Sequence, residues 1–99
     1  MPKAQDPAVI AAVAAEIKFR RGVAKISQEE LAHRADVNRT SIARMEIAKT
    51  QPSIAVLFRL AEAFEVDVSV LVAGIEQRYK AQKDSGAKAL STSITTKSS

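Results

Sequence analysis

The chemistry most readily assigned to this sequence belongs to three polar residues in the segment NRTSIARMEIAK, residues 38–49. Arg39 and Arg44 carry planar guanidinium groups, which can donate two parallel hydrogen bonds to paired acceptors such as O6 and N7 of guanine. Thr40 offers a hydroxyl group together with a methyl group that can contact thymine. These residue types, placed close together, favour recognition of base edges over covalent chemistry.

Residues for catalysis or metal binding are sparse. The chain has no cysteine and a single histidine, His33, which has no partners at metal-ligand spacing. Neither paired carboxylates nor a glycine-rich phosphate loop is present, and Ser27 is interpreted as a helix cap rather than a nucleophile. We therefore expect no enzymatic activity, no cofactor and no metal site.

The charge of the chain is unevenly distributed. Its 99 residues, enough for one small domain, carry a net charge of +4. Residues 17–49 alone sum to +4, whereas residues 50–79 sum to −2. This distribution favours one basic face suited to a polyanion, although a solvated charged surface would give the same sums.

The N-terminal part of the sequence shows no targeting or membrane segment. Its longest uncharged apolar run, PAVIAAVAA at residues 7–15, is followed at once by Glu16 and has no basic leader. A transmembrane helix needs about 20 apolar residues, and a signal peptide needs a positively charged start. We expect a cytoplasmic protein without membrane contact.

Hydrophobic spacing predicts five helices and no strand, so the fold class is all-α. The first helix is expected from Pro7 to about Val23, and Ser27 with Glu30 forms the S-x-x-E pattern that opens the second. The residues expected to cap the five helices are Asp6, Ser27, Asn38, Ser53 and Asp67. The apolar stripes of the last two helices are expected to comprise Ile54, Leu57, Leu60, Ala61, Phe64, Val68, Leu71, Val72, Ile75 and Tyr79.

The predicted domain spans residues 7–83 and follows a short N-terminal arm at residues 1–6. Gly74 is a candidate for the end of the fifth helix or for a kink in it, because glycine is a weak helix former. Residues 84–99 are half serine and threonine and show no sustained period. We expect this tail to be disordered.

The second and third predicted helices are short and are separated by a three-residue turn at residues 36–38. Two helices joined in this way cross near a right angle, so that one can lie over a DNA backbone while the next enters the major groove. With Ile42 and Met45 facing inward, the third helix exposes the two arginines and the threonine described above. The sequence therefore predicts a docking bend followed by a reading helix.

Three further residues are candidates for phosphate contact. Gln28 lies at the first turn of the second helix, where a side-chain amide and free backbone N–H groups suit a phosphate oxygen. The hydroxyl group of Ser41 can reach a phosphate from the third helix. Lys49 follows that helix, where a loop can touch the DNA backbone.

Residues 17–73 resemble the lambda-repressor and Cro-like family of helix-turn-helix regulators, also called XRE-type. The resemblance is carried by ISQEELAHRADV at residues 26–37, by NRTSIARMEIAK at residues 38–49 and by PSIAVLFRLAEAFEVDVSVL at residues 52–71. It covers more than half of the chain without a gap. It implies a five-helix lambda-repressor-like fold, sequence-specific binding to double-stranded DNA, and a homodimer.

The resemblance also assigns roles to single residues. It implies base contacts by Arg39, Thr40 and Arg44 and a phosphate contact by Gln28. It also implies a structural ion pair between Arg21 and Glu46. The sequence departs from the family at three helix ends where glycine is common: Asp36, Ala48 and Glu65. These corners are expected to be strained or of another shape, Asp36 least so, because a left-handed backbone costs most other residues roughly 1–2 kcal/mol.

The fifth helix is the expected dimer contact. Val70, Ile75 and Tyr79 extend its apolar surface beyond what five short helices can bury, and exposed apolar patches usually mark contacts. The alternative is local packing of a longer last helix. A two-fold dimer would set its two reading helices about 34 Å apart, one duplex turn.

The function expected from the sequence is transcription regulation by a homodimer on a palindromic operator, of the controller or repressor type. The sequence does not separate repression from activation through contact with RNA polymerase. Two alternatives stay open. One is an antitoxin of the same fold that also binds a toxin protein, and the other is a protein-interaction adaptor that does not read bases.

Overall fold

The computed structural model describes the backbone of residues 6–98 and the side chains of residues 6–84. This part of the chain forms five helices and no strand, so the expected all-α fold is confirmed. The helices are α1 (Pro7–Ala24), α2 (Gln28–Ala35), α3 (Arg39–Glu46), α4 (Ile54–Ala63) and α5 (Val68–Ser98). The expected N-terminal arm at residues 1–6 lies outside the described residues except for Asp6, whose carboxylate accepts a hydrogen bond from the N–H of Ala8 at 2.9 Å.

Side-chain caps set the starts of α2, α3 and α4 at the expected residues. Ser27, Asn38 and Ser53 each accept a hydrogen bond from a backbone N–H two or three residues further on, at 2.7–3.2 Å. These bonds satisfy N–H groups that have no partner inside the helix. Short helices therefore begin where the sequence places a serine or an asparagine.

The first four helices each end in a left-handed residue that is not glycine. Lys25, Asp36, Ala48 and Glu65 have φ angles of 57°, 54°, 58° and 60°. In every case the next N–H donates to the carbonyl five residues earlier, at 2.9–3.2 Å, which closes the helix end. The helix ends at Asp36, Ala48 and Glu65 thus adopt the left-handed conformation that glycine usually occupies, and Lys25 is a fourth such helix end.

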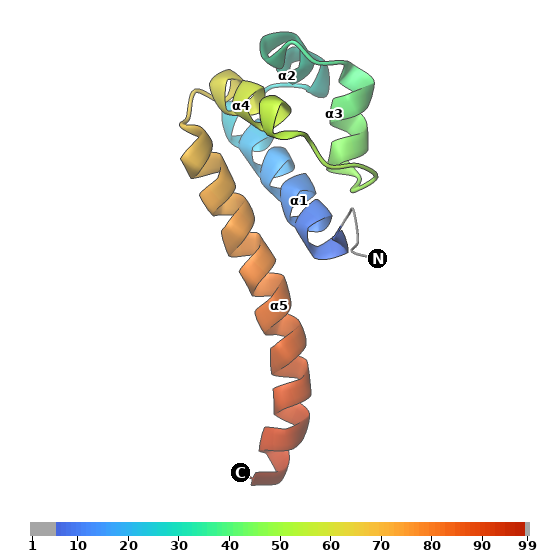
Figure 1. Cartoon of the computed structure of the whole chain (residues 1–99), viewed down its shortest axis with the longest axis vertical. Helices are drawn as coiled ribbons and strands as arrows, with labels where there is room; N and C mark the ends of the chain where they lie inside the picture. Colours follow the sequence, from blue (N-terminus) through green and yellow to red (C-terminus); the bar gives the residue numbers. More distant parts are fainter. Residues whose placement is uncertain (1–5, 99) are drawn as a thin grey trace.

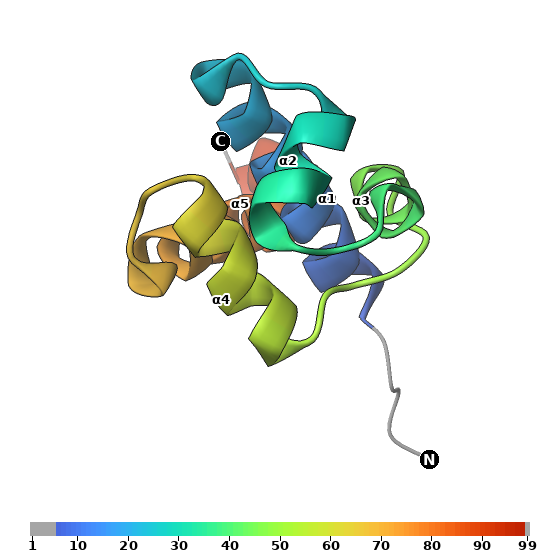
Figure 2. The ribbon, with the colours of Figure 1, turned by 90° about the horizontal axis from the view of Figure 1, so that it is seen from above.

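The helices pack around one core, with α1 and α5 side by side and α2, α3 and α4 gathered at the end opposite the C-terminus of α5 (Figure 1). In Figure 2, α3 is seen nearly end-on while α2 lies across the view, so the two helices meet at a sharp corner. The five largest fully buried side chains come one from each helix: Ile17, Leu31, Ile42, Leu60 and Leu71. Both α2 and α3 are therefore held by tertiary contacts, as helices of eight residues require.

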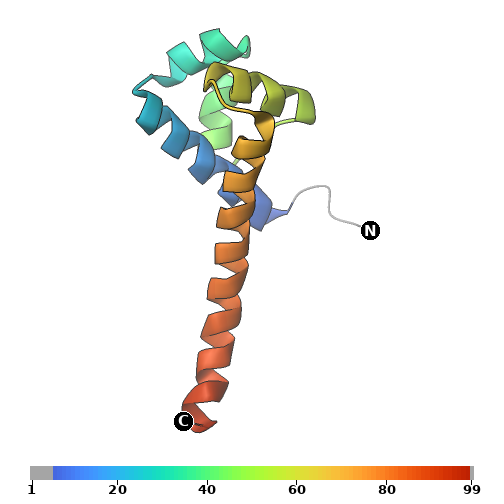
Figure 3. The same ribbon diagram turned by 90° about the vertical axis from the view of Figure 1, so that its left-hand side faces the viewer.

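The last two helices differ from expectation in three respects. Ile54 and Val72, expected within the inward apolar stripes, are 69% and 43% exposed. The fifth helix continues through Gly74 without a break and extends as backbone helix to Ser98, away from the other four helices (Figure 3). Disorder of residues 84–99 stays a prediction from composition, at odds with this helical backbone.

The residues expected to form a dimer interface on α5 do not share one exposed face. Ile75 is 8% exposed and belongs to the core cluster, so the expectation that it lies on the surface is wrong. Val70 is exposed, and Tyr79 packs partly against the core. Tyr79 follows Val70 by nine positions, about two and a half turns, which puts these two side chains on opposite sides of the helix.

Candidate nucleic-acid interface

The outward side of α3 carries a continuous line of three exposed side chains. Ile42 and Met45 are buried against the core, at 0% and 2% exposure. Thr40, Arg44 and Ile47 recur at i, i+4 and i+7 on the opposite side, the spacing of one helix face, and all three are exposed. This reading line presents a hydroxyl, a guanidinium and an aliphatic group to the same surface.

Ile47 was not among the site residues expected from the sequence. It occupies the C-terminal cap of α3 and is 64% exposed, although a large aliphatic side chain is usually buried. An aliphatic group at this position can contact the methyl group of thymine. The sequence signal that could have identified Ile47 is its spacing. It follows Thr40 by seven residues, which places both side chains on one face of a helix that extends to its cap.

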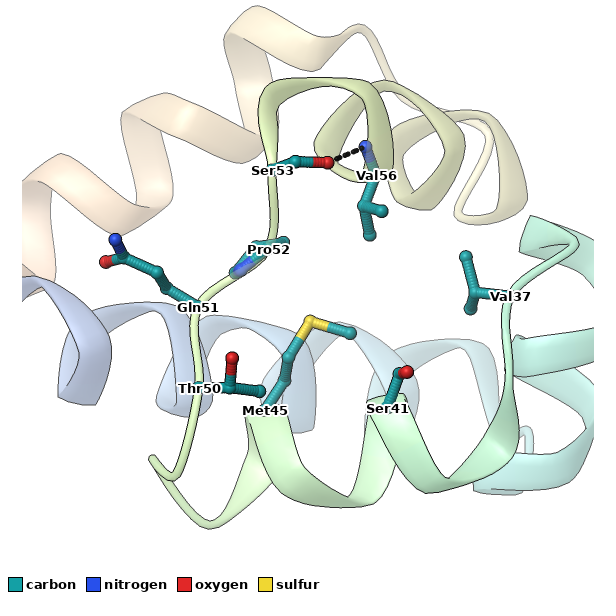
Figure 4. A pocket seen from close by; sticks show the side chains of 8 residues that line it. All are labelled: Val37, Ser41, Met45, Thr50, Gln51, Pro52, Ser53 and Val56. Atoms are coloured by element: carbon teal, nitrogen blue, oxygen red, sulfur yellow. Dashed lines mark hydrogen bonds between the residues drawn. The ribbon is translucent and has the colours of Figure 1, made fainter. Parts of the chain in front are cut away.

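Arg39 and Ser41 lie on the two flanks of α3 rather than on the reading line. Arg39 borders a surface hollow together with Gln28, at the start of α2. Ser41 faces the other way, toward the gap between α3 and α4 (Figure 4). The structure thus brings two of the expected base-contact residues, Thr40 and Arg44, onto one face and sets the third beside an expected phosphate contact.

The gap between α3 and α4 is a hollow of about 150 Å³. In Figure 4 the side chains of Met45 and Ser41 point into it from α3, across from the N-terminal end of α4. Hydroxyl groups of Ser41, Thr50 and Ser53 line it. The Ser53 oxygen accepts a hydrogen bond from the N–H of Val56, which leaves its own O–H free to donate to an anion.

The ion pair expected between Arg21 and Glu46 is present and joins α1 to the end of α3. Two parallel hydrogen bonds make the pair: Nε donates to Oε2 at 2.7 Å, and Nη2 donates to Oε1 at 3.0 Å. The remaining Nη1 of Arg21 donates to the carbonyl of Ile26 at 3.0 Å. Glu46 is 4% exposed, so this clamp fixes α3 from inside the fold.

Burial opposes ionisation of Glu46, but hydrogen bonds from Arg21 and Gln28, with the charge of Arg21, hold the pKa of this carboxyl below its ordinary value. The hydrogen bond to Glu46 likewise raises the pKa of the Arg21 guanidinium. Both groups are therefore ionised at neutral pH. A paired and hydrogen-bonded carboxylate of this kind fixes geometry, and removing one partner is costly.

Gln28 is shared between the interior and the surface. The residue is half-buried, and its Nε2 donates to Oε1 of Glu46 at 3.0 Å. An amide nitrogen carries two hydrogens, so one remains for an outside acceptor such as a phosphate oxygen. Lys49, the other expected phosphate contact beyond α3, is exposed.

The described part of the chain offers neither a metal site nor a membrane span. No group of three or more histidine, cysteine, aspartate or glutamate side chains there could hold a metal ion. None of the helices in the described range is sufficiently long and apolar to span a membrane.

A family model described as helix-turn-helix matches residues 17–71, more than half of the chain. The chain belongs to the XRE-type helix-turn-helix family. This membership places the helix-turn-helix protein among DNA-binding transcription regulators, and α2 and α3 are its two motif helices. The matched range contains all the candidate base and phosphate contacts.

Solved regulators share the fold of this helix-turn-helix protein. The crystal structure of the clp gene regulator ClgR from Corynebacterium glutamicum has a TM-score of 0.76 at 16% identity, covering 88% of this chain and 93% of that one. The wild-type restriction-modification controller protein C.Esp1396I has a TM-score of 0.65 at 24% identity, covering 71% and 90%. No curated protein sequence matches the chain. At these identities the likeness establishes the fold.

Proposed function

We propose that this helix-turn-helix protein is a cytoplasmic regulator that binds a palindromic operator as a homodimer, in the manner of a controller or repressor. The observation that carries the proposal is the reading line of Thr40, Arg44 and Ile47 on the side of α3 opposite the core. The clamp of Arg21 and Glu46 supports it, because a helix that reads bases must be held rigidly.

The reading line is suited to the major groove, which admits one α-helix. Arg44 can donate two hydrogen bonds to O6 and N7 of a guanine, and Thr40 and Ile47 can pack against thymine methyl groups. Arg39, at the N-terminal end of α3, reaches base edges from the α2 side, where the first residues of a reading helix approach the groove. All four side chains are exposed.

Phosphate contacts on both flanks of α3 would set its register on the duplex. On one flank, Gln28 offers its second amide hydrogen at the N-terminal end of α2. On the other, the hydroxyl of Ser41 lies beside those of Thr50 and Ser53 around the hollow of Figure 4. Lys49 adds a positive charge at the end of α3.

The proposed dimer surface is an apolar groove along α5, bordered by α1 and the start of α4. Ile75 and Tyr79 of the interface expected from the sequence line it, whereas Val70 does not. Ile54 at the start of α4 and Val72 on α5, which both line it, are 69% and 43% exposed. Two adjoining hollows share Val9 and Val72 in their linings and extend along this side of α5. Covering such a groove with a second copy removes apolar surface from water, which favours association.

Sedimentation equilibrium tests this surface with a matched pair of variants. Val72→Asp puts a charge into the groove and should give the monomer mass, whereas Ala73→Asp, at the exposed neighbouring residue, should keep the dimer mass. Both variants leave the buried residue Ile75 untouched, so both should fold. A Val72→Asp protein that keeps the dimer mass would remove the interface from this groove.

Selection of bound duplexes from a random pool at about 0.15 M salt tests the whole proposal. A palindromic consensus with half-sites about one turn apart would support a dimeric regulator that reads sequence. Binding without enrichment of any sequence would instead favour the adaptor, or an antitoxin that reads DNA only with its toxin partner.

A further inference from the structure

The side of α5 away from the dimer groove meets α1 at a buried carboxylate. Glu16 is 2% exposed, and both of its oxygens accept hydrogen bonds from arginines. Nε of Arg20, one turn along α1, donates to Oε2 at 2.7 Å, and Nε of Arg78 on α5 donates to Oε1 at 2.9 Å. This carboxylate therefore ties the two helices together across 62 residues of sequence.

Gly74 allows the helices to come this close. A Cβ atom added at Gly74 would lie 2.4–2.6 Å from the carboxylate atoms of Glu16, nearer than real contacts allow. The carboxylate cannot swing aside without giving up bonds to two arginines. Gly74, a candidate from the sequence for the end of this helix or for a kink in it, is therefore a contact residue inside a continuous helix.

Phe19 completes what we call the α1–α5 joint, formed by Glu16, Phe19, Arg20, Gly74 and Arg78. The guanidinium carbons of Arg78 and Arg20 lie 5.2 Å and 5.9 Å from the centre of the Phe19 ring, within the range of cation–π attraction. Three members, Glu16, Gly74 and Arg78, fall outside residues 17–71, the range matched by the family. These three residues thus lie just beyond the ends of the matched range.

The joint and the proposed dimer groove occupy opposite sides of α5. Two residues turn a helix through roughly 200°, so Val72 in the groove points away from Gly74 in the joint. The hollows place them likewise, since Val72 lines the two hollows of the groove, one of which reaches α4, whereas Gly74 lines the hollow shared with Phe19. The joint therefore contacts the side of α5 opposite the one that would meet the second copy.

One helix links the joint to the reading helix. On α1, Glu16 binds α5 through Arg78, and Arg21, just over a turn later, binds α3 through Glu46. In addition to the shared core, these two ion pairs on α1 therefore connect α3 to α5. Loosening either ion pair should loosen the orientation of α3 relative to α5.

We propose that the α1–α5 joint fixes the spacing between the two half-sites that the dimer accepts, with Arg78 and Gly74 as positioning residues. The inference rests on the proposed dimeric, base-reading function. Adding one base pair between half-sites moves them apart by about 3.4 Å and rotates one relative to the other by about 34–36°. A dimer with a rigid joint cannot follow this change, whereas a dimer with a loose joint can.

The experiment measures affinity for a panel of operators, built from the selected half-site, in which the spacing is one or two base pairs longer or shorter than the selected one. The proteins are the wild type, Arg78→Met, Gly74→Ala and Gly22→Ala. Gly22 also lies inside a helix, but a Cβ added there meets no atom within 4 Å, so it is the matched control. Binding of each protein to one isolated half-site reports on the reading helix alone.

We expect the wild type and Gly22→Ala to lose affinity by about tenfold or more when the spacing changes by one base pair. Arg78→Met and Gly74→Ala should lose less than about threefold, while their affinity for the isolated half-site stays at the wild-type level. Thermal melting of each variant reports that it is folded.

Two results would overturn the inference. A folded Arg78→Met or Gly74→Ala protein that keeps the wild-type spacing profile would show that the joint does not set spacing. A parallel fall in affinity for all operators and for the half-site would show a role in stability alone. A wild type without any spacing preference would instead refute the dimeric function on which the inference rests.

Discussion

Replacing Arg21 by methionine tests how firmly the reading helix is held. The change removes two hydrogen bonds to Glu46 and one to the carbonyl of Ile26, but keeps most of the aliphatic stem. Glu46, 4% exposed, would retain its bond from Gln28 but lose its cation. Breaking a buried pair in this way costs about 3–5 kcal/mol of unfolding free energy.

The lower end of this range is the expected value, because 26% of the Arg21 side chain is exposed. A loss of about 3 kcal/mol should lower the melting temperature by roughly 12–24 °C for a domain of this size. Since small domains have unfolding free energies of about 5–15 kcal/mol, the variant should still fold at low temperature. Its DNA affinity there should be reduced, because α3 has lost a fixed contact with α1.

The loss should depend on pH with a defined sign. The pKa of Glu46 in the folded protein is lowered, so its pairing adds stability above the unfolded value of about 4.3 and loses it as pH falls through the folded pKa. In Arg21→Met the buried Glu46 carboxylate has lost its paired cation. Protonating it at low pH removes the cost of burying this charge, so the variant then loses less unfolding free energy relative to the wild type. The difference between wild type and variant should therefore be large at pH 7 and shrink below about pH 4.

Urea unfolding at a series of pH values measures this difference, with Arg34→Met as the control. Arg34 pairs with Glu30 at 2.9 Å, but both side chains are at least 40% exposed, so this loss should stay below about 1 kcal/mol. A loss for Arg21→Met of less than about 1 kcal/mol at pH 7, or one that does not change with pH, would refute the reasoning.

Three further predictions address the helix ends, the tail and the phosphate contacts. Ala48→Gly should raise the unfolding free energy by about 0.5–1 kcal/mol, because it removes a left-handed alanine. Ala73→Gly, at an exposed helical residue, should lower it by a similar amount. A lower unfolding free energy in both variants would contradict this. Amide hydrogens of residues 85–98 should exchange at nearly unprotected rates, since half of these residues are serine and threonine, which are weak helix formers. Protection equal to that of α1 would show a stable helix. Lys49→Ala should lower the slope of log affinity against log salt by about two for a dimer, and an unchanged slope would remove Lys49 from the phosphate contacts.

Features encoded by neighbouring residues could be predicted from the sequence. Ser27, Asn38 and Ser53 cap helices by bonds that span two or three residues, so their chemistry and position suffice. The inward positions of α3 follow from spacing alone, and with them the outward positions of Thr40 and Arg44. The pairing of Arg21 with Glu46, 25 residues apart, came only from the family resemblance.

Features that depend on distant packing could not be predicted. Ile54 and Val72 fit apolar stripes by spacing, but which edge of a stripe another helix covers is decided by tertiary contacts, and both are exposed. Glu16 reads as an ordinary charged residue until Arg78, 62 residues away, is placed beside it. Gly74 looked like a break in α5 because the close approach of Glu16 is invisible in a linear pattern.

The central claim is that the line of Thr40, Arg44 and Ile47 reads bases. The most direct test repeats the random-pool selection with Arg44→Ala, and with Arg34→Ala on α2 as the control. Loss of preference at one base position in each half-site, with the rest of the consensus and the Arg34→Ala consensus unchanged, is the predicted result. An unchanged consensus for Arg44→Ala, with equal weakening on selected and random DNA, would make Arg44 a phosphate contact and contradict the account.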